Sequence, residues 1–216
     1  MRTKLLLLSG VSLILFTYFS YTVAKERWQQ IDFDTTVKIQ DQIPKKFDDN
    51  FSLFSLLGSA EVTVGFCLII IALALLKLRW LAILGWLMII PASAAEIFGK
   101  LILYHPGPPL LFHRTTLATH LPSFYINTEF SYPSGHMTRI IFVTTILFFL
   151  IFFSRRNFFL KYTLLLGILG FAFLMGLSRV SLGEHWLSDV IGGTILGVSL
   201  GLFALVLILR PAQDQP

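Results

Sequence analysis

Long apolar stretches dominate this sequence, and each of them is long enough to cross a lipid bilayer as a helix. They lie at residues 5–24, 54–76, 80–103, 137–153, 160–177 and 190–209. A helix needs about 20 apolar residues to span the hydrocarbon core. The chain is 55% hydrophobic and only 13% charged, which excludes an ordinary soluble domain. We therefore predict an all-α, polytopic membrane protein whose six transmembrane helices form one bundle.

The distribution of lysine and arginine predicts the orientation of this bundle. If the six spans alternate, one side receives Arg2, Lys4, Lys77, Arg79, Arg155, Arg156, Lys161 and Arg210. Cytoplasmic loops are enriched in basic residues, so we expect a cell-membrane protein with both termini in the cytoplasm. The extracytoplasmic side then receives residues 25–53 and the loop 105–136. Residues 25–53 carry five basic and six acidic side chains, so the net charge of +5 is mostly an orientation signal and does not indicate nucleic-acid binding.

We predict that residues 1–216 form one domain, because no repeat or low-complexity linker divides them. The first span also resembles a cleavable signal peptide, but its apolar run is long for one, and we expect a retained helix.

Glycines recur at helical spacing within two of the spans. Gly193, Gly197 and Gly201 share one face of the last span, where they allow a neighbouring helix to approach closely. We expect Gly167 and Gly170 to do similar work in the fifth span.

Two polar islands interrupt the apolar pattern, each at the predicted outer end of a span. One is residues 132–136, Tyr-Pro-Ser-Gly-His, and the other is residues 178–189, which hold Ser-Arg and then a histidine and an aspartate. Ionisable groups at such a boundary cost free energy unless they are paired or used. Two islands on one membrane face therefore indicate a site.

The second island has the chemistry of an oriented nucleophile. His185 and Asp189 are four residues apart, so on a helix the carboxylate can accept a hydrogen bond from one imidazole nitrogen and leave the other free. The guanidinium of Arg179 presents a planar fork of donors that suits phosphoryl oxygens.

The first island suits an anion and a proton donor. Ser134 and Gly135 precede a predicted helix, whose first amides can hold a phosphate, and His136 is placed to protonate a leaving oxygen. Each island alone has a structural explanation, as a turn and cap, a snorkelling arginine or a polar pair between helices. Their combination on one face favours a phosphate-handling active centre.

Together the islands resemble the second and third signature motifs of the type 2 phosphatidic acid phosphatase superfamily. Pro-Ser-Gly-His at 133–136 and Ser-Arg-(five residues)-His-(three residues)-Asp at 178–189 occur in the family's order, and the resemblance covers roughly residue 96 to the last span. It implies that His185 attacks phosphorus and forms a phosphohistidine, that Asp189 orients it, and that His136 protonates the leaving group. It further implies phosphate binding by Arg179, with Ser134 and Gly135, and no metal or other cofactor.

The first family motif, a lysine followed after six residues by Arg-Pro, is incomplete here. Lys100 is present, but Gly107 stands in the place of the arginine. The replacement candidates are His105, Arg114 and Arg139.

Lys100 has a structural explanation besides phosphate binding. Glu96 lies four residues before it, a spacing at which the two side chains can form an ion pair on a helix. With the resemblance, we expect Lys100 to bind phosphate and Glu96 to support it.

We therefore expect an integral membrane phosphatase that hydrolyses a lipid phosphate or diphosphate at the extracytoplasmic face of the bilayer. Polyprenyl diphosphate, phosphatidic acid and phosphatidylglycerophosphate all remain open as substrates. Two alternatives remain: a phosphotransferase that passes the phosphoryl group to a second lipid, and a catalytically silent lipid-binding protein.

Overall fold

The computed structural model describes residues 1–116 and 130–209. In chain order, its helices are α1 (Arg2–Ala24), α2 (Gln29–Gln42), α3 (Asp48–Ser55), α4 (Ala60–Leu76), α5 (Trp80–Leu87), α6 (Ile89–Ile102), α7 (Gly135–Phe152), α8 (Phe158–Ser181) and α9 (Leu187–Ile208). Short 3-10 turns lie at η1 (Lys45–Phe47), η2 (Leu56–Gly58) and η3 (Leu110–Phe112). The described residues form no β-strand beyond an isolated bridge, and the all-α prediction is confirmed.

Within the described residues, five helical segments are long and apolar enough to cross a membrane, and a bent pair brings the number to six. The consecutive helices α5 and α6 together make one span, Trp80–Ile102. The second expected span, residues 54–76, is not one helix. Its first residues belong to the end of α3 and to η2, and α4 begins after a bend of 41°. Ser59 is extended there and its Oγ caps α4 by accepting the N–H of Val62 at 3.3 Å.

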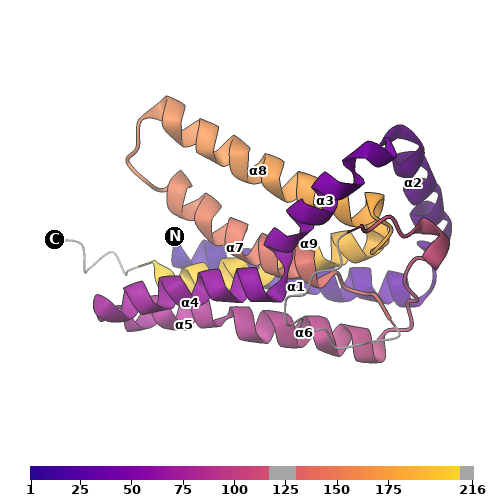
Figure 1. Cartoon of the computed structure of the whole chain (residues 1–216). Helices are drawn as coiled ribbons and strands as arrows, with labels where there is room; N and C mark the ends of the chain where they lie inside the picture. The colour runs from indigo at the N-terminus through magenta and orange to yellow at the C-terminus, as the bar shows by residue number, and fades with distance from the viewer. Residues whose placement is uncertain (117–129, 210–216) are drawn as a thin grey trace.

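α9 is the central helix of the bundle and packs against α1, α5 and α7 (Figure 1). Its glycines permit the contact with α7: a β-carbon at Gly193 would lie 2.5 Å from the carbonyl oxygen of Ser134, and one at Gly197 would lie 2.6 Å from that of Thr138. The predicted close approach is confirmed. Gly167 and Gly170 have no atom in reach of such a carbon, so the same expectation for the fifth span is wrong. Both lie on the mostly exposed helix α8.

The bundle has two chemically different ends. At one end, Arg2 Nε donates to the carbonyl oxygen of Val206 at 2.7 Å, which joins the start of α1 to the last turn of α9. The α4–α5 and α7–α8 connections, with most of the basic residues used for orientation, lie at this same end (Figure 1, left). Both polar islands lie at the other end.

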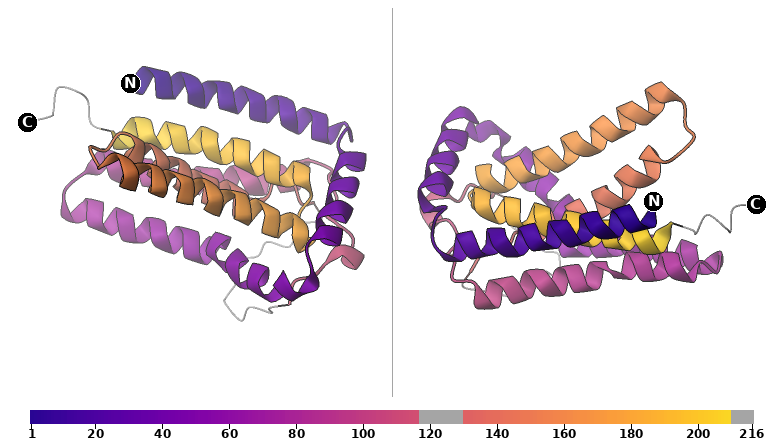
Figure 2. Two further views of the ribbon diagram at one scale, coloured as in Figure 1. Left: turned by 90° about the horizontal axis from the view of Figure 1, so that it is seen from above. Right: turned by 180° about the vertical axis from the view of Figure 1, so that it is seen from behind.

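Residues 25–53 contribute two helices to the end of the bundle that carries the islands. α2 runs across this end, nearly perpendicular to α1, and contacts α8 and α9 (Figure 2). α3 packs against α8. The segment for which the sequence predicts no role therefore borders the candidate site.

Candidate active site

A tight turn between α8 and α9 places His185. Gly183 adopts a left-handed conformation with φ +66°, and a β-carbon there would overlap the backbone of Phe112. The amides of Gly183 and Glu184 donate to the carbonyls of Val180 and Arg179 at 3.0 and 3.1 Å, which is the Schellman pattern of a helix end. His185 therefore lies in a turn and not on a helix, contrary to the spacing argument. α9 begins two residues after it.

The pairing of His185 with Asp189 exists in spite of that difference. His185 Nδ1 lies 3.2 Å from Asp189 Oδ2, and the same oxygen accepts the backbone N–H of Trp186 at 3.0 Å. Asp189 is in the first turn of α9, where a carboxylate caps the free amides and is favoured by the helix dipole. The capping geometry therefore fixes the carboxylate that contacts His185.

The two islands are joined by their backbones. The N–H of Ser134, the residue before α7, donates to the carbonyl oxygen of Asp189 at 3.0 Å. Ser134 is fully buried, and its Oγ forms no hydrogen bond within the described part of the chain. The starts of α7 and α9 are thus held side by side.

A buried charge cluster lies at the start of α7. Glu96, on α6, accepts from Lys100 Nζ at 2.7 Å through Oε1 and from Arg139 Nη1 at 2.7 Å through Oε2. A β-carbon at Gly135 would overlap the Glu96 carboxylate, so only glycine fits this position. The Glu96–Lys100 ion pair exists, and it shares its carboxylate with Arg139. The side chains of Lys100 and Arg139 and the start of α7 therefore all lie around the Glu96 carboxylate.

Arg179 is fully buried at the end of α8. Its guanidinium contacts the hydroxyl of Ser55 on α3 and the carboxylate of Glu184. His136, the second residue of α7, is only half-buried and packs against Gly58. His136, which the sequence suggests as the proton donor, is therefore more exposed than His185.

The charges from these helices act on His185. Its pKa is held well below the ordinary value, first by burial and then by the positive charges of Lys100 and Arg179. At neutral pH the imidazole is therefore uncharged, the form in which a ring nitrogen can act as a nucleophile.

The three candidates to replace the arginine of the first family motif lie in different parts of the structure. Arg139 lies beside Lys100, in the charge cluster at the start of α7. Arg114 lies elsewhere and donates to the carbonyls of Gln40 and Ile43 at the end of α2. His105 Nε2 lies 3.4 Å from Asp189 Oδ1, the carboxylate oxygen that does not contact His185.

Sequence reasoning missed four residues that touch the site: Asp32, Ser55, Glu184 and Ser188. Asp32 binds Ser188, whose side chain also contacts His105. Asp32 and Ser55 belong to helices with no recognisable motif, so no sequence signal marks them. Glu184 and Ser188 lie inside the second island. Their positions next to His185 and Asp189 in the sequence are the only indication that they belong to the site.

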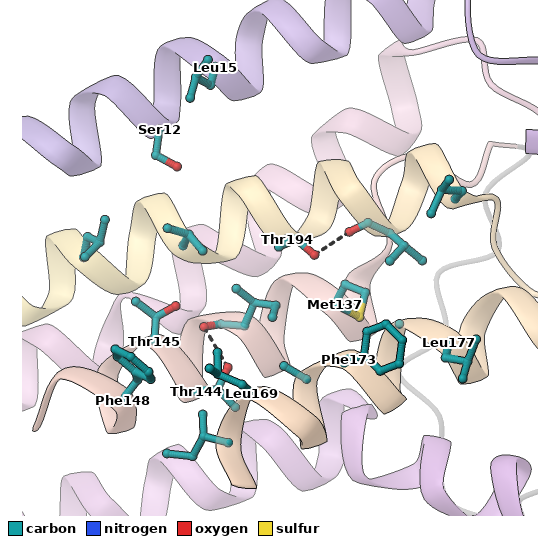
Figure 3. Close-up of a pocket in the computed structure, with 18 of the residues that line it drawn as sticks. Ser12, Leu15, Met137, Thr144, Thr145, Phe148, Leu169, Phe173, Leu177 and Thr194 are labelled. Carbon is teal, nitrogen blue, oxygen red and sulfur yellow. Dashed lines mark hydrogen bonds between the residues drawn. The ribbon is translucent and has the colours of Figure 1, made fainter. Parts of the chain in front are cut away.

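A large cavity lies on the other side of α7. It has a volume of about 960 Å³ and is walled almost wholly by apolar side chains of α1, α7, α8 and α9 (Figure 3). Met137 lines it, whereas Arg139, two positions on and therefore on nearly the opposite helix face, points toward Glu96. The cavity suits hydrocarbon and is separate from the charged groups.

Comparison with known proteins found a family and two similar solved structures. Residues 80–211 match the PAP2 superfamily. A transmembrane PAP2-type phosphatidylglycerolphosphate phosphatase from Bacillus subtilis has a TM-score of 0.65 at 19% identity, covering 91% of this chain and 93% of that one. LpxE from Aquifex aeolicus has a TM-score of 0.57 at 19% identity, covering 81% of this chain and 94% of its own. A search of curated protein sequences found no match.

Proposed function

We propose that this chain, which belongs to the PAP2 superfamily, is an integral membrane phosphatase that hydrolyses a lipid phosphate or diphosphate through a phosphohistidine on His185. The observation that carries the proposal is the geometry of His185, whose Nδ1 is held by Asp189 at 3.2 Å while cations from α6 and α8 act on the same ring. That combination serves one chemistry well: attack by a neutral, oriented imidazole on an anionic phosphorus centre.

In the first step, the phosphoryl group binds among Lys100, Arg139 and Arg179, at the start of α7. His185 Nε2 attacks phosphorus, and the bond from phosphorus to the lipid oxygen breaks. His136 gives its proton to that oxygen, so the lipid leaves as an alcohol or, from a diphosphate, as a monophosphate. Asp189 keeps the Nδ1–H of His185 directed at its carboxylate and stabilises the positive charge on the ring.

In the second step, His136, now neutral, takes a proton from a water molecule. The water oxygen attacks phosphorus, the bond to His185 Nε2 breaks, and inorganic phosphate leaves. Neither step requires a group beyond these side chains and water, so we expect turnover to persist when divalent metals are chelated.

The place of the site in the bilayer supports a lipid substrate. Lys100 lies on a spanning helix whose neighbouring residues Phe98 and Leu101 are 61% and 62% exposed, as lipid-facing side chains are. A lipid headgroup can reach the cations from this side while its hydrocarbon remains in the membrane. The charge distribution supports an extracytoplasmic site, because the basic connections lie at the opposite end.

The test is release of inorganic phosphate by the detergent-purified protein, with a chelator present, from polyprenyl diphosphate, phosphatidic acid and phosphatidylglycerophosphate. We expect release to fall to background in His185→Ala and to persist in His113→Ala, since His113 is an exposed histidine outside the site. Equal release by wild type and His185→Ala would contradict the proposal.

The same assay separates the alternatives. Transfer of labelled phosphate to a second lipid without free phosphate would indicate a phosphotransferase. Binding of the lipids with no turnover in any variant would indicate a silent binding protein.

A further inference from the structure

A buried carboxylate from the N-terminal segment lies against the start of α9. Asp32, on α2, is 1% exposed. Its Oδ1 accepts the backbone N–H of Ser188 at 2.8 Å, and its Oδ2 accepts the Ser188 hydroxyl at 2.7 Å. Ser188 directly precedes Asp189, so Asp32 holds the backbone that carries the nucleophile's carboxylate.

His105 connects Asp32 to Asp189. Its Nε2 lies 3.1 Å from Ser188 Oγ, 3.4 Å from Asp189 Oδ1 and 3.8 Å from Asp32 Oδ2. Because the Ser188 hydroxyl gives its hydrogen to Asp32, its oxygen can only accept from His105. The proton of a neutral His105 is therefore on Nε2, where it faces acceptors of α2 and α9.

The charges within this group oppose one another. The pKa of Asp32 is raised to about 6, mainly by burial and to a smaller extent by the nearby Asp189, against the two Ser188 hydrogen bonds that lower it. Burial lowers the pKa of His105, whereas Asp189 raises it. Tyr132 and Lys100 are further neighbours. The ring of Tyr132 is edge-on to His105 with centroids 6.2 Å apart, and the charge of Lys100 acts on Asp189. Two buried carboxylates and one imidazole thus compete for a proton in mildly acidic solution.

We propose that Asp32 and His105 are positioning residues that extend the His185–Asp189 pair into a four-membered chain and set the pH range in which it works. This inference rests on the proposed function. When His105 is neutral, its Nε2–H donates to the Ser188 hydroxyl oxygen, and Nε2 lies 3.4 Å from Asp189 Oδ1 without a hydrogen bond to it. The full negative charge of Asp189 then acts on His185. When His105 gains a proton, its positive charge attracts the Asp189 carboxylate. The hydrogen bond between Asp189 and His185 then weakens.

The test is the pH profile of Asp32→Asn. The amide oxygen can still accept the Ser188 N–H, but the negative charge that favours protonated His105 is gone. We expect the acidic limb of kcat to move to lower pH, and kcat at neutral pH to fall about tenfold, as is typical when an outer partner of an oriented ligand is lost. KM should stay within twofold, because Asp32 does not touch the substrate. The matched control is Asp41→Asn, an exposed aspartate of the same helix.

An acidic limb and a kcat that match those of wild type would overturn the proposal. So would a lower melting temperature without a change in the pH profile, because Asp32 would then be only structural.

A second measurement does not depend on turnover. In protein with ¹⁵N-labelled histidine, the His105 signal is assigned by its loss in His105→Asn. We expect its titration midpoint to fall in Asp32→Asn and to stay unchanged in Asp41→Asn. An unchanged midpoint in Asp32→Asn would overturn the coupling, even if the wild type releases no phosphate. Wild type without activity but with a shifted midpoint would refute the proposed function while leaving the coupling intact.

Discussion

Replacement of Arg139 by leucine tests whether this residue supplies the guanidinium that the first family motif lacks. Arg139 is 8% exposed and lies 2.7 Å from Glu96. A hydrogen bond to a charged group contributes about 1.5–3 kcal/mol. At about 1.4 kcal/mol per factor of ten, its loss predicts a fall in kcat/KM of about 10- to 150-fold.

The same substitution also leaves Glu96 with Lys100 as its remaining cation in the cluster, and this second effect must be separated from the first. Removing one partner of a buried pair costs about 3–5 kcal/mol when no other charge compensates, so with Lys100 in place we expect a stability loss of about 3 kcal/mol or less. Glu96→Gln removes the negative charge that has lost one of its two cations. In Arg139→Leu/Glu96→Gln we therefore expect the melting temperature to recover while kcat/KM stays low.

The assay is phosphate release over a substrate series, with thermal unfolding in detergent measured in parallel. Arg2→Leu is the control, because Arg2 also donates a hydrogen bond but lies at the opposite end of the bundle. Arg139→Leu with kcat/KM within threefold of wild type would refute the phosphate-binding role. Full recovery of activity in the double variant would show instead that Arg139 only neutralises Glu96.

Three further predictions follow from other residues of the fold. Gly135→Ala should abolish phosphate release, because its β-carbon overlaps the Glu96 carboxylate. Gly167→Ala should keep activity and raise stability by up to about 1 kcal/mol, because alanine has a higher helix propensity than glycine. Thermal unfolding and phosphate release measured on both variants check these expectations. His136→Gln should lose far more activity on a lipid alkoxide than on p-nitrophenyl phosphate, whose leaving group needs no proton; equal losses would remove its role as the acid. Because folding raises the pKa of Asp32 from 3.8 to about 6, the folded state binds that proton more tightly, and stability should fall as pH rises from about 4 to 6; Asp32→Asn should flatten the dependence of melting temperature on pH over this interval.

The sequence predicted the membrane architecture well, because the hydropathy of a segment reflects whether lipid or water surrounds it. Glycine spacing in α9 correctly predicted the close contact with α7. The same reasoning was wrong for Gly167, because a spacing rule does not say whether any neighbour faces the helix. The second span was also misjudged, since apolar residues of α3, η2 and α4 run together in sequence while Ser59 breaks the helix.

The site could be predicted only where its residues are local in sequence. His185 and Asp189 are four residues apart, and the expected pair exists although a turn, and not a helix, carries His185. The choice of Arg139 over Arg114 depends on where α7 and α2 lie relative to Glu96. Asp32 lies 156 residues from its partner Ser188, and nothing in its surrounding sequence indicates that contact.

Capture of the covalent intermediate tests the phosphohistidine mechanism directly. Wild type and His185→Ala are mixed briefly with a ³²P-labelled lipid phosphate or diphosphate, quenched in alkali, digested and analysed by mass spectrometry. The phosphohistidine mechanism predicts an acid-labile, base-stable phosphoryl group on His185 in wild type, with no labelled peptide in the variant. Phosphate release by wild type with no label on His185, or with the label on another residue, would contradict it.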